Sequence, residues 1–252
     1  MIYHLQTNGN CGKITESANK GADFVIKNVL LDLDDTLLDF KRAEAIAIRD
    51  TFIELNIDPS EENIKLYSTI NRSCWARLEL GELTRDEVLH NRFDILFQKL
   101  GIEGDSHKSQ EIYEYKLSFG AFYLDGAEEL LNTLQGKYRL YLATNGIIKV
   151  QTRRIADSGI GKYFDDIFIS EKIGYNKPDK RFFDISFNTI PDFKQEETVI
   201  IGDTLTSDIK GGINAGIRTV YFNPGRKENK TDIIPDYEIH SLSELPQLIE
   251  KM

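Results

Sequence analysis

Short apolar runs that end in polar residues recur along this chain. The first, Val29-Leu-Leu31, stops at Asp32 and Asp34, and a hydroxyl follows at Thr36. Runs of this length are typical of strands buried on both faces, and residues past their carboxyl ends line the crevice where open α/β sheets bind ligands. The pattern predicts a buried strand with two carboxylates at its ligand-binding end, although such acids also occur in ordinary solvated turns.

The apolar spacing changes to that of helices after this strand. Helices are predicted over residues 41–56, 60–80 and 110–119, and Thr84-Arg-Asp-Glu87 has the pattern of a capping box that opens another. Residues 40–120 therefore read as an all-helical insert. Because the insert follows the first strand, it lies above the carboxyl end of that strand and can close over a ligand.

From residue 125 onward, strands and helices alternate. Strands are predicted over residues 138–143, 164–170, 198–201 and 219–222, and helices near 149–157, after Pro178 in the first helical turn, and after the cap Ser241-Leu-Ser-Glu244. This alternation indicates a doubly wound, Rossmann-like parallel sheet with helices on both faces. We predict an α/β core of residues 24–39 and 121–252, a helical cap of residues 40–120, and a polar N-terminal tail of residues 1–23 without an assigned function.

Composition limits the partners and the compartment. The 31 basic and 41 acidic residues give a formal charge of −10, which repels nucleic acid and anionic membranes, so we expect neither as a partner. A chain with this charge would need a bound metal ion to attract a small phosphate ligand. The two cysteines, Cys11 and Cys74, form no zinc or disulfide motif, and residues 1–23 contain no apolar signal region, so a reducing, cytoplasmic setting is expected.

Polar residues of a consistent kind follow four of the predicted strands. They are Asp32 and Asp34, Thr144 and Asn145, Lys177, and Asp203 with Asp208. Each alone also fits a turn, a solvated loop lysine or the start of a helix. Their order at successive strand ends favours a single site for phosphate chemistry.

These motifs resemble those of the haloacid dehalogenase-like hydrolase superfamily over about residues 25–240. The matching stretches are Asp32-Leu-Asp34-Asp-Thr36, Thr144, Lys177 and Gly202-Asp203-Thr-Leu-Thr-Ser-Asp208, and the position of the insert matches the helical-cap class. Three stretches resemble more narrowly the 5'-nucleotidases that hydrolyse pyrimidine and non-standard nucleoside monophosphates. They are Asp32-Leu-Asp-Asp-Thr-Leu-Leu-Asp-Phe40, the cap stretch from Asn71-Arg-Ser-Cys-Trp75 to Arg92-Phe93, and Gly202-Asp-Thr-Leu-Thr-Ser-Asp-Ile-Lys-Gly-Gly212.

The resemblance implies a magnesium-dependent phosphomonoester hydrolase that works through an aspartyl phosphate. Asp32 would be the nucleophile, and Asp34 the general acid for the leaving oxygen and then the general base for water. Neighbouring negative charge and partial burial are expected to favour protonated Asp34.

Magnesium and phosphate would be held by groups from the same motifs. Mg²⁺ would be bound by Asp32, the main-chain carbonyl of Asp34 and Asp203, with Asp208 as a direct or outer contributor. Thr144 and the main-chain amide of Asn145 would hydrogen-bond phosphate oxygens, and Lys177 would supply fixed positive charge.

Substrate preference is expected to come from the cap. Phe40, Asn71, Trp75 and Arg92 are candidates for facing the cleft, although Trp75 also fits a core position and Arg92 a surface ion pair. The partner is expected to be a small phosphate monoester, and both a monomer and a dimer stay open.

Three other functions compete with a nucleotidase. A haloacid dehalogenase in the strict sense needs neither the second acid Asp34 nor magnesium. A sugar-phosphate phosphatase or phosphomutase differs only in the cap. A phospho-accepting signalling module also combines an aspartate, a hydroxyl residue and a lysine, but it needs neither a cap nor a leaving-group acid. The dinucleotide fingerprint and the Walker loop are both incomplete in this sequence.

Overall fold

The computed structural model describes residues 25–252, so the predicted tail of residues 1–23, which includes Cys11, lies outside the described part. The described chain contains a six-stranded sheet of order β3-β2-β1-β4-β5-β6, and every neighbouring pair in it is parallel. The strands are β1 (Asn28–Leu31), β2 (Arg139–Thr144), β3 (Asp166–Ile169), β4 (Thr198–Gly202), β5 (Arg218–Phe222) and β6 (Tyr237–Ile239).

Helices connect the strands and also form the insert. The helices of the insert are α1 (Phe40–Glu54), α2 (Glu61–Glu79), α3 (Arg85–Leu100) and α4 (Ser106–Leu117). Those of the core are α5 (Ala127–Leu134), α6 (Ile148–Ser158), α7 (Ser170–Ile173), α8 (Lys180–Phe187), α9 (Lys210–Ala215) and α10 (Leu245–Ile249). A π-helical turn, Leu205–Ile209, leads from β4 into α9.

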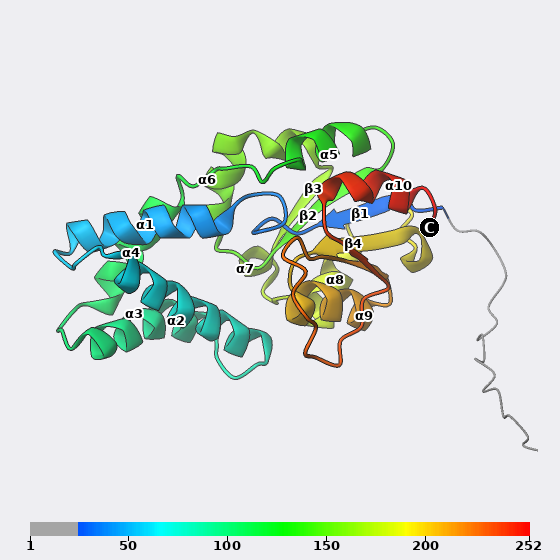
Figure 1. The fold of residues 1–252 in the computed structure, drawn as a ribbon. Coiled ribbons are helices and arrows are strands. Elements are labelled where there is room, and N and C mark those ends of the chain that lie inside the picture. The colour runs from blue at the N-terminus through cyan, green and yellow to red at the C-terminus, as the bar shows by residue number, and fades with distance from the viewer. Residues whose placement is uncertain (1–24) are drawn as a thin grey trace, which may run out of the picture.

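Helices cover both faces of the sheet, as the fully buried β1 requires (Figure 1). Val29 and Leu31 belong to the cluster that includes residues of α5, α6 and α10, and Leu30 belongs to the cluster that includes residues of α8. Side chains alternate between the faces of a strand, so the apolar run Val29–Leu31 fits a strand between two helical layers. The predicted doubly wound parallel fold with a helical insert is confirmed.

The insert, which we call the cap, has its own apolar core and lies beside one end of the sheet (Figure 1). Tyr67, Phe93 and Tyr113 meet at its centre, with ring centroids 5.2 to 6.0 Å apart. The predicted capping box is present at the start of α3, where Thr84 and Glu87 each bind the main-chain N–H of the other. This core is built mainly from cap residues, and Val150 of α6 joins it, so the cap packs as a unit against α6.

The two chain segments that join the cap to the sheet run side by side. The main-chain N–H of Asp39 donates to the carbonyl of Phe122 at 2.8 Å, and that of Leu124 to the carbonyl of Leu37 at 2.9 Å. The chain therefore leaves the core and returns to it at one point, just beyond the carboxyl end of β1.

The predicted elements agree with the observed ones to within a few residues, apart from Pro178 and four elements that were not predicted. Pro178 precedes the N-cap Asp179 of α8 and is not in the first helical turn as predicted. The elements that the sequence did not predict are α5, α7, α9 and the edge strand β6, which has only three residues, two of them exposed. None of the described helices is both long enough and apolar enough to span a membrane.

Candidate active site

The predicted residues of the first, second and fourth motifs lie together because their strands are neighbours. The central strand β1 pairs with β2 on one side and β4 on the other. Asp32 follows β1, Thr144 ends β2 and Asp203 follows β4, so the three side chains lie at the same edge of the sheet. The hydrogen-bond register of a parallel sheet thus determines the spacing of residues that are far apart in sequence.

Lys177 joins this group from the loop between α7 and α8. Its ammonium donates to Asp32 Oδ1 at 2.7 Å, to Asp208 Oδ1 at 2.6 Å and to the carbonyl of Ala143 at 2.6 Å. The side chain is only 1% exposed, so these three acceptors replace the water that the ammonium gives up on burial. The Lys177 ammonium is therefore fixed between the carboxylates of Asp32 and Asp208.

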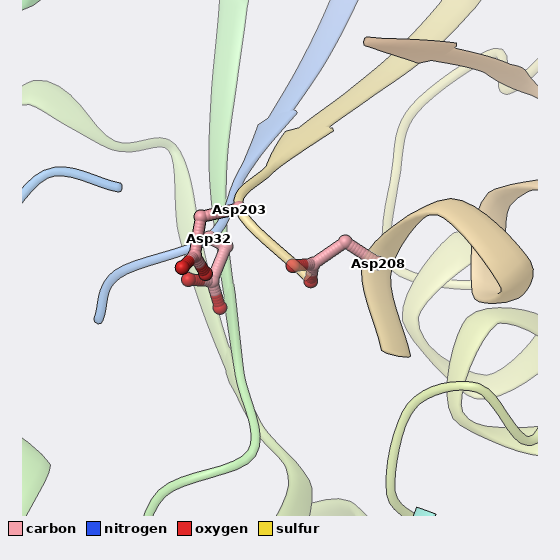
Figure 2. Close-up of side chains that lie close together, drawn as sticks. All are labelled: Asp32, Asp203 and Asp208. Carbon is pink, nitrogen blue, oxygen red and sulfur yellow. The ribbon is translucent and has the colours of Figure 1, made fainter. Parts of the chain in front are cut away.

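Asp32, Asp203 and Asp208 bring carboxylate oxygens within 4.8 Å of one another. Figure 2 shows the first two at the strand ends and Asp208 reaching toward them from the following helical turn. A Cβ atom on Gly202 would lie 2.2 Å from the Asp208 carboxyl carbon, so glycine at this position permits the approach. Three carboxylates around one ammonium leave an excess of negative charge, and oxygen ligands suit a hard divalent cation, so this donor set fits Mg²⁺.

Burial makes the charged form of these acids costly. It raises the pKa of Asp32 well above its usual range, against the opposing effect of the Lys177 ammonium. Burial, together with the charge of Asp208, raises the pKa of Asp203 to about 7. A cation among the carboxylates would remove this penalty, which again fits a metal site.

The second predicted acid, Asp34, has partners that the sequence reading did not identify. Its carboxylate accepts hydrogen bonds from Arg154 and, at 2.7 Å, from Gln151 Nε2. Both donors come from α6 and are buried, and Arg154 also donates to the carbonyl of Gly120 at 2.8 Å. Asp34 was expected to have mainly negative neighbours, but a buried cation lies against it. Gln151 and Arg154 are three residues apart on one face of α6, the helix after β2. This spacing was the feature of the sequence that could have identified them as partners of one group.

The predicted phosphate-binding residues Thr144 and Asn145 are hydrogen-bonded to other residues of the site. Thr144 Oγ1 accepts a hydrogen bond from Gln151 Nε2 at 2.9 Å, so Gln151 contacts both this hydroxyl and Asp34. The Asn145 side chain binds the main chain of Lys177 twice, donating to its carbonyl at 2.9 Å and accepting from its N–H at 2.8 Å. Asn145 thereby locks the β2 loop to the loop that carries Lys177.

A cavity of about 650 Å³ lies between these residues and the cap. The four cap residues proposed from the sequence all line it: Phe40, Asn71, Trp75 and Arg92. Arg92 is buried, and Gln110 and Asn71 accept hydrogen bonds from its guanidinium. It is therefore not a surface ion-pair residue. The buried carboxylate of Glu44, which accepts from Asn71 at 2.6 Å, also lines the cavity.

One carboxylate of the cap reaches the core next to the acid cluster. Glu79, at the end of α2, accepts a hydrogen bond from the hydroxyl of Thr206 in the turn that carries Asp208. Burial raises the pKa of Glu79 to about 7. The contact makes Glu79 a titratable group at the junction of cap and core.

The chain belongs to the haloacid dehalogenase-like hydrolase family, whose sequence pattern it matches over residues 26–216. It is therefore a hydrolase, as predicted. The chain is 44% identical to YfnB of Bacillus subtilis over 88% of its own length and 95% of that protein. A crystal structure of magnesium-bound YfnB, described as revealing interdomain movement, covers 89% of this chain and 99% of that one, with a TM-score of 0.86.

Two further relatives have names that state a substrate class. The pyrimidine 5'-nucleotidase PynA of Streptococcus pneumoniae is 39% identical, over 89% of this chain and 95% of that protein. The pyrimidine 5'-nucleotidase YjjG of Escherichia coli is 30% identical, over 88% of this chain and 97% of that protein. The predicted similarity to 5'-nucleotidases is thus confirmed for the chain as a whole.

Proposed function

We propose that this protein is a magnesium-dependent phosphomonoesterase that hydrolyses nucleoside 5'-monophosphates through an aspartyl phosphate. The observation that carries the proposal is the contact of Asp32 with the buried Lys177 ammonium, inside a cluster with two further carboxylates and beneath the cap cavity. The names of PynA and YjjG support the substrate class, and pyrimidine nucleotides are accordingly the first to test.

In the first step, an Asp32 carboxylate oxygen attacks phosphorus. The bond from phosphorus to the ester oxygen breaks, and its electron pair goes to that oxygen, which takes a proton from Asp34. Arg154 and Gln151 orient the Asp34 carboxyl. Because Gln151 also contacts Thr144, the acid and a phosphate-binding hydroxyl share one anchor.

In the second step, Asp34 takes a proton from water, whose oxygen attacks phosphorus. The bond from phosphorus to Asp32 breaks, which frees inorganic phosphate and regenerates the carboxylate. The Thr144 hydroxyl and the Asn145 main-chain N–H donate to phosphate oxygens, and Lys177 balances their charge. These donors stabilise the negative charge that spreads over the oxygens in the transition state.

The metal would be held by Asp32, the main-chain carbonyl of Asp34, Asp203 and Asp208. When bound, magnesium offsets the repulsion between a carboxylate nucleophile and the phosphate oxygens. The excess of carboxylates over ammonium groups in the cluster supports this ligand set.

The cap cavity suits a nucleoside better than a small sugar. Trp75 and Phe40 offer aromatic surface for a base, and Glu44, Asn71 and Arg92 offer hydrogen-bonding groups that are already held in position. The cytoplasmic setting and the small-molecule phosphate partner are part of the proposal.

A screen of phosphorylated metabolites, with free phosphate as readout, tests the function. We expect turnover of nucleoside monophosphates with magnesium, loss of turnover in EDTA, and no turnover by Asp32→Asn at unchanged far-UV circular dichroism. Preference for sugar phosphates would reject the substrate class, and an active Asp32→Asn variant would reject the nucleophile.

A comparison of leaving groups tests Asp34 separately. Asp34→Asn should lose about 100-fold or more in kcat on a nucleoside monophosphate, whose alkoxide needs a proton, and much less on p-nitrophenyl phosphate, whose phenolate does not. Equal losses on the two substrates would contradict the acid role.

A further inference from the structure

Arg85, the first residue of α3, connects the cap to the core loops beside the active site. Its Nη2 atom donates to the hydroxyl of Ser170, to the side-chain oxygen of Asn176 and, at 3.5 Å, to the carbonyl of Asn145. These three acceptors come from two loops of the core, at the ends of β2 and β3. A single guanidinium of the cap thus holds two core loops together.

The loops that Arg85 contacts are those that carry the proposed phosphate-binding groups. Asn176 directly precedes Lys177, and Asn145 carries the main-chain N–H proposed to bind phosphate. The side chain of Asn145 also binds the main chain of Lys177 twice. Arg85, Asn145 and the Lys177 loop therefore form one connected unit in which a shift of one member displaces the others.

Arg85 does not line the cavity itself, so it acts behind the groups that face the substrate. All three contacts are made by Nη2, whose two N–H groups can bond two acceptors at once, and the contact with Asn145 is the longest. Its contacts form only when the cap lies against the core, because Arg85 belongs to the cap and all three acceptors to the core.

We infer that Arg85 is a positioning residue, through which docking of the cap sets the Lys177 and Asn145 loops for phosphate binding. This inference rests on the proposed function for the identity of the phosphate site. It assigns to the cap a second task besides substrate choice, because Arg85 adds its hydrogen bonds to the Asn145–Lys177 brace only when the cap is docked.

Orthovanadate, a phosphate mimic, tests the inference through binding and needs no turnover. With Arg85→Met, its dissociation constant by calorimetry in magnesium should rise about 10- to 100-fold, and KM for the substrate should rise in parallel. Arg85→Lys keeps the charge on a shorter side chain that cannot reproduce the position of Nη2, so an intermediate value is expected. Arg77→Met is the matched control, because Arg77 is exposed in the cap and, among residues 25–252, forms an ion pair only with Glu82.

A double-mutant cycle separates positioning from a general loosening of the cap. Asn176→Ala should weaken orthovanadate binding, and the double variant with Arg85→Met should bind no more weakly than the worse single variant. Additive losses, or an Arg85→Met variant that binds orthovanadate like Arg77→Met, would overturn the inference. An inactive wild type that binds orthovanadate would reject the proposed hydrolysis alone, and a wild type that binds none would reject both.

Discussion

Replacement of Lys177 by methionine removes the cation at the centre of the acid cluster and keeps the length of the side chain. The ammonium is 1% exposed and contacts two carboxylates at 2.7 and 2.6 Å. Removal of one partner from a buried ion pair costs about 3 to 5 kcal/mol, because the other partner stays buried without compensation. We expect a loss of this size in the free energy of unfolding at neutral pH without metal.

The loss should depend on pH in a defined direction. Burial already raises the pKa of Asp32, and removal of the Lys177 charge, which opposes that rise, raises it further. At about pH 5 more of the carboxyls are neutral, so the variant should be closer to the wild type there than at about pH 8. Urea unfolding followed by circular dichroism in EDTA measures both differences.

Magnesium should restore much of the lost stability. A cation that binds only the folded state stabilises it by mass action, and the variant presents the same carboxylates without a competing ammonium. Saturating magnesium should therefore raise the melting temperature of Lys177→Met more than that of the wild type, while activity stays absent. Lys180→Met is the control, because Lys180 lies three positions away on the surface and pairs with Asp184. Equal magnesium shifts in Lys177→Met and the wild type would refute this account of the cluster.

Two further predictions concern buried groups around the cleft. Burial raises the pKa of Glu79 from 4.5 to about 7, so its ionisation destabilises the fold as pH rises. In metal-free buffer Glu79→Gln should gain up to about 3 kcal/mol over the wild type between about pH 5 and pH 8, and a constant difference in urea unfolding would contradict this. Arg154→Met should lower kcat about 10- to 100-fold through misplacement of Asp34, whereas exposed Arg153→Met should not, and equal kcat values would rule out the orienting role.

The chemistry-bearing residues were predictable because each lies next to a local signal. Asp32 and Asp203 directly follow apolar runs, and Lys177 lies just before a proline in the loop after another strand. Short apolar runs that alternate with helices are typical of buried parallel strands, and the ends of parallel strands meet at one edge of the sheet. Local pattern and topology together were enough to bring these residues into one site.

The partners of Asp34 were not predictable in the same way. Arg154 and Gln151 lie on an ordinary amphipathic helix, and they meet Asp34 only through the fold, across more than 110 positions of sequence. The burial of Arg92 was not predictable either, because its hydrogen-bond acceptor Gln110 comes from another helix of the cap. Strand β6 was missed for a different reason: a three-residue edge strand with two exposed positions has no apolar pattern.

The paired joints of the cap have a consequence for how this enzyme can diversify. Because the segments on either side of residues 40–120 are hydrogen-bonded to each other, an exchange of that stretch between relatives leaves the sheet and its acids untouched. Substrate selectivity could then change through replacement of the cap alone, while the acid cluster of the core stays the same. The contacts between cap and core, among them those of Arg85 and Glu79, constrain which caps are compatible with this core.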